Sequence, residues 1–190
     1  MKIKKIAIGI GLIIALVIVA LIVVMGFIFM DAMSYTATGS EVMSPVGNAT
    51  GNALVVYDPG ISGYSKDMAV KIAGDLQVKG YTVTLAGVRS SAAANTSDYD
   101  VIVAGGPTYA GNISSSIGAY LKELKPQNNA KIGVFATGQD KDILNDPAGL
   151  RKEVTSLPDD SPLKIKAITK FVQGDDVDKR RAGFITELLQ

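Results

Sequence analysis

The amino-terminal part of the chain is an unbroken apolar run. From Ile6 to Met30 the sequence reads IAIGIGLIIALVIVALIVVMGFIFM, without a charged or strongly polar side chain. As a helix this run is ~37 Å long, more than the roughly 30 Å hydrocarbon core of a bilayer. A signal peptide has a shorter apolar region of about 7–15 residues and then a small-residue cleavage site, which FMDAMSYTATG matches poorly. The pattern therefore predicts one uncleaved membrane-spanning helix at residues 1–30.

Beyond this run the pattern changes twice. Residues 31–52 are rich in Ser, Thr, Gly, Ala and Asn and show no apolar periodicity, which is typical of a flexible linker. In residues 53–190, short apolar runs alternate with segments whose apolar residues recur at helical spacing. We expect strands at 53–57, 81–85, 101–104, 131–136 and 163–172, and helices at 65–79, 117–124, 147–156 and from 177 onward.

This alternation predicts the fold class. Strands that alternate with helices form a parallel sheet covered on both faces. The helix expected between the second and third strands is nearly missing, because only RSSAAANTSD stands there. We expect an α/β domain at residues 53–190 with a doubly wound, five-stranded parallel sheet in the order 2-1-3-4-5. In that order ligands bind beyond the carboxyl ends of the strands, where the first and third strands lie side by side.

The charges beside the apolar run predict the orientation of the anchor. Lys2, Lys4 and Lys5 precede it, and the next Lys or Arg is Lys66. Positively charged flanks stay on the cytoplasmic side of a membrane. We therefore expect a single-pass cell-membrane protein with a cytoplasmic amino terminus and with residues 31–190 on the outer side.

The composition limits which catalytic groups and metal sites the chain can form. The chain has no Cys and no His, and its net charge is +1. Thiol nucleophiles, disulfides, zinc sites of the usual kind and Ser-His triads are thereby excluded, and the charge does not favour a nucleic-acid partner. The chemistry left is that of carboxylates, amines, hydroxyls or a bound cofactor.

The loop after the first strand has the features of a phosphate site. It reads DPGISGYSKDMA and leads into a helix, whose amino terminus can bind a phosphate without Lys or Arg. Gly60 and Gly63 permit close approach of the backbone, and Ser62 and Ser65 add hydroxyl donors. The alternative is a plain strand-to-helix connection capped by Ser65.

Three segments resemble the flavodoxin family. VVYDPGISGYSKDMA is similar to its phosphate loop, YDVIVAGGPTYAGNISSSIGAYL to its strand-three region, and KIGVFATGQ to its fourth strand. PTYAGN, at residues 107–112, is the most specific of these stretches. The resemblance covers residues 53 to about 140 and implies bound FMN with a role in electron transfer.

The resemblance also implies the cofactor site. The FMN phosphate would lie on the first loop and the flavin ring between the other two, with Tyr109 close to the ring's face. A turn residue packed on the surface is the alternative for Tyr109. The implied cofactor-binding residues are Gly60, Ser62, Gly63, Tyr64, Ser65, Pro107, Thr108, Tyr109, Ala110, Gly111, Asn112, Thr137, Gly138 and Gln139.

The chain also departs from the family's pattern. Gly60 stands where the family has Ser or Thr, Asp58 would repel a phosphate if it pointed inward, and no aromatic residue follows the fourth strand. Two alternatives to a flavodoxin-like electron carrier therefore stay open. One is an interaction or scaffold module without flavin, which the expected outer location favours. The other is a flavin-dependent quinone or flavin reductase.

Neither a catalytic residue nor a metal site is expected. An electron carrier needs no acid or base of its own, and its partner would be a redox protein or a quinone. Asp140, Asp142 and Asp146 lie close together in the sequence, but they lack the Gly and the terminal Glu of an EF-hand loop. We interpret them as part of a solvated loop.

Overall fold

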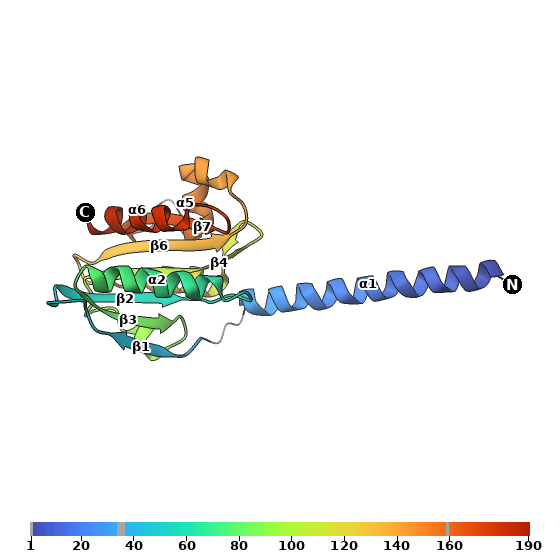
Figure 1. The fold of residues 1–190 in the computed structure, drawn as a ribbon, viewed down its shortest axis with the longest axis horizontal. Coiled ribbons are helices and arrows are strands. Elements are labelled where there is room, and N and C mark those ends of the chain that lie inside the picture. Colours follow the sequence, from blue (N-terminus) through green and yellow to red (C-terminus); the bar gives the residue numbers. More distant parts are fainter. Residues whose placement is uncertain (1, 34–36, 159) are drawn as a thin grey trace.

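The computed structural model describes residues 2–33, 37–158 and 160–190, and shows one long helix followed by an α/β domain (Figure 1). The long helix, α1, covers Lys2–Met33 and extends away from the domain. Within the described residues, it is the one helix long and apolar enough to cross a membrane. Its candidate span is Gly9–Ile28, with a mean hydropathy of 3.2 and exposed side chains.

The domain is built on a mixed sheet of seven strands, where we had expected five parallel strands. Its order is β1-β3-β2-β4-β6-β7, and β5 pairs with β4 outside that path. Two short strands, β1 and β5, pair antiparallel with their neighbours, whereas the other pairs are parallel. The strands are β1 (Ser40–Met43), β2 (Gly51–Tyr57), β3 (Tyr81–Gly87), β4 (Val101–Tyr109), β5 (Asn112–Ile113), β6 (Lys131–Gly138) and β7 (Ile165–Val172).

Strand β1 corrects the expectation for residues 31–52, which we had taken as linker throughout. Ser40 pairs with Ala86 and Met43 with Val83, so β1 covers the outer edge of β3. An uncovered edge strand invites pairing with other chains, and here the edge strand is β1, which has only four residues. The sequence SEVM is too short to show an alternating pattern, which is why the strand could not be predicted.

Helices cover both faces of the sheet and enclose two apolar cores. Successive residues of β2 alternate between them: Ala53 and Val55 face one core, and Leu54 and Val56 face the other. The first core lies under α2 (Tyr64–Val78) and α6 (Val177–Leu189). The second lies under α3 (Ser91–Ala94), α4 (Ser115–Glu123) and α5 (Pro147–Thr155), with a short 3₁₀ helix, η1 (Asp142–Asn145), before α5.

The packing of β4 against β6 leads to a stability prediction. Gly105 pairs with Phe135, and a methyl group at Gly105 would overlap the Phe135 ring. We expect Gly105→Ala to destabilise the domain by about 1–3 kcal/mol, the usual cost of overpacking a core. Gly183→Ala in α6 is the control, because nothing lies within 4 Å of its added methyl group. Urea unfolding of the full chain in detergent, followed by circular dichroism, measures both; equal stability of the two variants would contradict the prediction.

Candidate functional site

A cavity of about 570 Å³ opens at the carboxyl ends of β4 and β6, beside the start of α2. The chain leaves β2 for β3 on one side and reaches β4 on the other, so the cavity lies at the switch point of the sheet. Its wall is formed by the loop after β2 with the start of α2, by the carboxyl ends of β4 and β6, and by the residues that directly follow β6 and β7. The lining residues are Ile61, Ser62, Tyr64, Asp67, Pro107, Thr108, Tyr109, Thr137, Gly138, Gln139 and Gln173.

Two glycines shape the loop after β2. Gly60 and Gly63 have φ values of +62° and +74°, in the left-handed region that glycine adopts without strain. A side chain at Gly60 would lie 2.8 Å from Cγ of Pro107 and 3.3 Å from the hydroxyl of Tyr109, so the first loop packs closely on the second. A side chain at Gly63 would meet nothing within 4 Å of its Cβ. The start of α2 is therefore open to a ligand.

The carboxylate of Asp58 is turned away from the cavity. Asp58 is fully buried, and its Oδ1 accepts a hydrogen bond from the Gly60 amide at 3.0 Å. Its Oδ2 accepts from the hydroxyl of Ser116 in α4. Asp58 thus joins the first loop to α4 and does not face a phosphate on the other side of the loop.

The first turn of α2 differs from the capped connection considered above. Gly63 occupies the N-cap position and offers no side-chain cap, so Ser65 lies inside the helix. The Ser65 hydroxyl is buried and lies 2.6 Å from that of Thr137 at the end of β6. The Tyr64 amide donates to Ser62 Oγ at 3.3 Å. The amides of Ser65 and Lys66, in the first helical turn, have no acceptor within the helix.

The segment PTYAGN forms a tight β-hairpin. Tyr109 pairs with Asn112 across a two-residue turn, in which Ala110 and Gly111 have φ values of +49° and +73°. Positive φ at both central residues is the requirement of a type I′ turn. A residue with a Cβ costs roughly 1–2 kcal/mol in this conformation, so the hairpin holds Ala110 under strain. The turn fixes Tyr109 at the cavity wall, half-buried.

The loop after β6 begins at Gly138, next to a buried ion pair that the sequence analysis did not identify. Thr108 Oγ1 donates to the carbonyl of Thr137 at 3.2 Å and so joins the hairpin to the end of β6. A side chain at Gly138 would lie 2.8 Å from Cε of Lys170. Lys170 Nζ, in turn, donates to Glu153 Oε1 at 2.7 Å, and both side chains are buried. A charge within the apolar run AITKFV was the available signal.

The structure brings together part of the implied site. Eight of the implied residues line the cavity: Ser62, Tyr64, Pro107, Thr108, Tyr109, Thr137, Gly138 and Gln139. Gly60, Gly63, Ser65, Ala110, Gly111 and Asn112 are not among its lining residues. Asn112 lines a different hollow, together with Lys122 and Lys152.

Three lining residues were not expected. Gln173 directly follows β7, so its place at a carboxyl strand end was the signal for it. Ile61 is an apolar residue in a polar loop and is 60% exposed at the cavity. Asp67 lies in the first turn of α2.

The side chains that line the cavity carry little charge. No Lys or Arg is among its described lining residues, and Asp67 carries a negative charge there. Burial raises the pKa of the Tyr64 phenol above its ordinary value, so this side chain stays neutral at physiological pH. An anion in the cavity would be bound by amides and hydroxyls.

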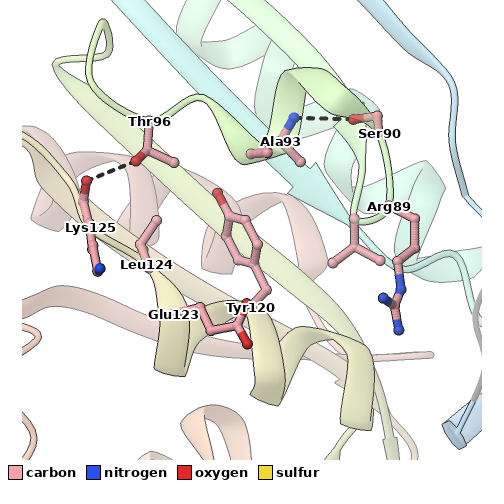
Figure 2. Close-up of a pocket in the computed structure, with 10 residues that line it drawn as sticks. Arg89, Ser90, Ala93, Thr96, Tyr120, Glu123, Leu124 and Lys125 are labelled. Carbon is pink, nitrogen blue, oxygen red and sulfur yellow. Dashed lines mark hydrogen bonds between the residues drawn. The ribbon is translucent and has the colours of Figure 1, made fainter.

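A second cavity, of about 400 Å³, lies between α3 and α4 (Figure 2). Tyr120 rises into this region from α4, and its hydroxyl finds no hydrogen-bond partner among the described residues. Burial raises the pKa of Tyr120. None of the implied site residues lines this cavity, so it is separate from the site at the strand ends.

Comparison with solved structures identifies the architecture. A Streptococcus pneumonia TIGR4 flavodoxin matches 73% of this chain and 97% of its own, with 18% sequence identity and a TM-score of 0.53. The domain has a flavodoxin-like fold. A flavodoxin from the domain Archaea matches 73% of this chain and 96% of its own, with 16% identity and a TM-score of 0.44. Neither a family model nor a curated protein sequence matches the chain.

The match to the Streptococcus pneumonia flavodoxin confirms the resemblance drawn from the sequence at the level of the fold. In this chain the helix α1 and the edge strand β1 precede β2. At 18% identity this match describes the fold and leaves the ligand to be argued from the site.

The hydroxyl pair between α2 and β6 gives a prediction for this site. Ser65→Ala leaves the buried Thr137 hydroxyl without its partner, and we expect a loss of about 1–3 kcal/mol in the free energy of unfolding. The double variant Ser65→Ala with Thr137→Val removes both polar groups and should recover most of that loss. Urea unfolding of the parent, both single variants and the double variant forms the cycle; additive losses would show that the hydroxyls are not coupled.

Proposed function

We propose that this chain is a membrane-tethered, flavodoxin-like protein that binds FMN and takes part in electron transfer. The observation that supports this most is the cavity at the switch point of the sheet. It lies between the open amino terminus of α2 and the hairpin that holds Tyr109. Its volume of about 570 Å³ is within the range of small-molecule and cofactor sites.

The phosphate would lie at the start of α2. The left-handed Gly63 leaves open space there, and the Ser65 and Lys66 amides of the first helical turn have no acceptor within the helix. These amides bind a dianion without a cationic side chain. Asp58 does not oppose this, because its carboxylate is engaged by Gly60 and Ser116.

The ring would lie between the hairpin and the loop after β6. Tyr109 and Tyr64 both line the cavity, so two aromatic side chains are present where the sequence alone indicated one. Thr108 and Gly138 also line the cavity, and Gly138 lies against the side chain of Lys170, which pairs with Glu153. Bound FMN supplies the electron chemistry; the chain orients the ring and excludes water from one side of it.

The flavin-free interaction module is the second candidate function. The Gly60 and Tyr64 amides are already taken, by Asp58 and by Ser62, which leaves fewer donors for a phosphate. A flavin-dependent quinone or flavin reductase would use the same cavity as the electron carrier. Turnover with NAD(P)H and a quinone separates that activity from simple electron carriage.

We also propose that α1 anchors the domain in the cell membrane. Its span at Gly9–Ile28 has the length and composition for one crossing. The amino-terminal lysines support an orientation with the start of α1 in the cytoplasm and the domain on the outer side. A redox protein or a quinone on that side would be the partner.

FMN binding is tested by fluorescence titration of the full chain in detergent. We expect saturable binding, and Gly63→Val should weaken it most, because the side chain fills the open space at the start of α2. Ser62→Ala should cost about 0.5–1.5 kcal/mol, the net value of one hydrogen bond. Tyr109→Ala should cost about 1–3 kcal/mol if ring stacking resembles that of bases on aromatic side chains.

The control for Gly63→Val is Gly47→Val. Gly47 has a φ of +87° and nothing within 4 Å, so the substitution brings comparable backbone strain away from the cavity. It should leave FMN affinity unchanged. If the parent binds no FMN at micromolar concentration, the flavin-free module becomes the better description. If it binds and the cavity variants bind equally well, the flavin lies elsewhere.

Orientation is tested with a protease. Added to intact cells or right-side-out vesicles, it should cut the domain or the segment that follows α1, because residues 31–190 are on the outer side. Cleavage restricted to inverted vesicles would contradict this orientation. Amino-terminal sequencing that began near Ser34 or Gly39 would instead show that α1 is removed.

A further inference from the structure

The anchor joins the domain at the edge of the sheet that carries the cavity. The Arg89 amide donates to the carbonyl of Ala37 at 2.9 Å, and the Gly87 amide to that of Gly39 at 2.8 Å. Gly87 is the last residue of β3, so these bonds hold the incoming chain at the carboxyl end of that strand. From there β1 runs toward the opposite edge, because it is antiparallel to β3.

The connection between anchor and domain is short. Helix α1 continues to Met33, and Ala37 is already bonded to the sheet edge. Four residue steps span at most roughly 14 Å. The helical residues from Ile28 to Met33 add ~8 Å. Together these two lengths hold the side of the domain at the carboxyl ends of the strands, here called the carboxyl edge, within about 22 Å of the end of the candidate span.

A second contact holds the domain on the same side. Helix α1 touches α4, which begins directly after the β4–β5 hairpin. In Figure 1, α1 leaves the domain on the side toward which β2 and β3 point. The contact with α4 and the hydrogen bonds to β3 come from different elements, yet they place the anchor at one edge.

We propose that the carboxyl edge of the domain faces the bilayer surface, so that the candidate cavity opens toward the membrane. This inference rests on the membrane anchoring proposed above and does not require bound flavin. The molecule that exchanges electrons at the cavity is then one held at or in the bilayer. A carrier that approaches from the surrounding solution meets the opposite edge of the sheet first.

One exposed aliphatic residue lies at the carboxyl edge of the sheet, and another lies at the opposite end of the strands. Ile61, beside the cavity, is 60% exposed, and Val78, at the far end of α2, is 68% exposed. Helix α2 runs antiparallel to the strands and has 15 residues, which separates its ends by ~22 Å. The chain contains no Cys, so a single cysteine at either position can be labelled without altering another site.

The experiment compares Ile61→Cys with Val78→Cys in the full chain, reconstituted in phosphatidylcholine vesicles. Each variant carries the same fluorophore, and the quencher is a nitroxide on the lipid headgroup. We expect quenching at position 61 to exceed that at position 78 at least about twofold, because position 61 precedes the start of α2 and position 78 is its last residue, so the ~22 Å length of the helix separates them. In detergent without quencher lipid, the two labelled variants should unfold at the same temperature as the parent.

A longer connection provides the control. Inserting 20 Gly and Ser residues before Ala37 adds a mean reach of roughly 25 Å, which should reduce the difference between the two positions. Equal quenching at both positions, or stronger quenching at 78, overturns the inference. Failure of the parent to stay with the vesicles overturns the anchoring and this inference together. Failure to bind FMN alongside a clear preference for position 61 removes the cofactor but supports the orientation.

Discussion

The pairing of β2 with strands on both of its sides is the constraint on which the rest of the molecule depends. β2 bonds to β3 and to β4 in parallel, so the chain must return over opposite faces of the sheet to form these two pairs. The helices that follow β2 and β4, α2 and α4, therefore pack on opposite faces of the sheet. The backbone continues the pairing just past the strands, from the Asp58 amide to the Gly105 carbonyl at 3.0 Å. A hollow at this edge follows from the strand order itself.

Buried polar contacts give that hollow a fixed shape. Asp58 bonds the first loop to α4, and the hydroxyls of Ser65 and Thr137 join α2 to β6. Thr108 joins the hairpin to β6, and the Lys170–Glu153 pair lies under Gly138. Buried polar groups that lose a partner are costly, so these contacts tend to persist together. They hold the three loops in fixed positions relative to one another without occupying the cavity. A rigid flat ligand requires such a preformed cavity.

Elements with a strong periodic pattern could be predicted from the sequence, and contacts between distant residues could not. The apolar positions Met68, Ile72 and Leu76 indicate α2 directly, and all three are buried. β1 escaped prediction because four residues carry no pattern and its pairing depends on β3. In the site, turn residues such as Gly60 showed where a loop bends. The partner of Asp58 lies 58 positions away, which no local pattern encodes.

The edge strand β1 both pairs with β3 and fixes the point at which the anchor meets the domain. It pairs with β3 and replaces that long strand at the edge of the sheet with one of four residues, the short kind of edge strand that limits pairing with other chains. Because the chain enters β1 at Gly39 and Ala37, the same hydrogen-bonded ribbon fixes where the anchor meets the domain. A strand running in the other direction would cover β3 equally well but would place the anchor at the opposite edge. The antiparallel direction of β1, which the sheet edge alone does not dictate, is therefore what brings the cavity to the same side as α1.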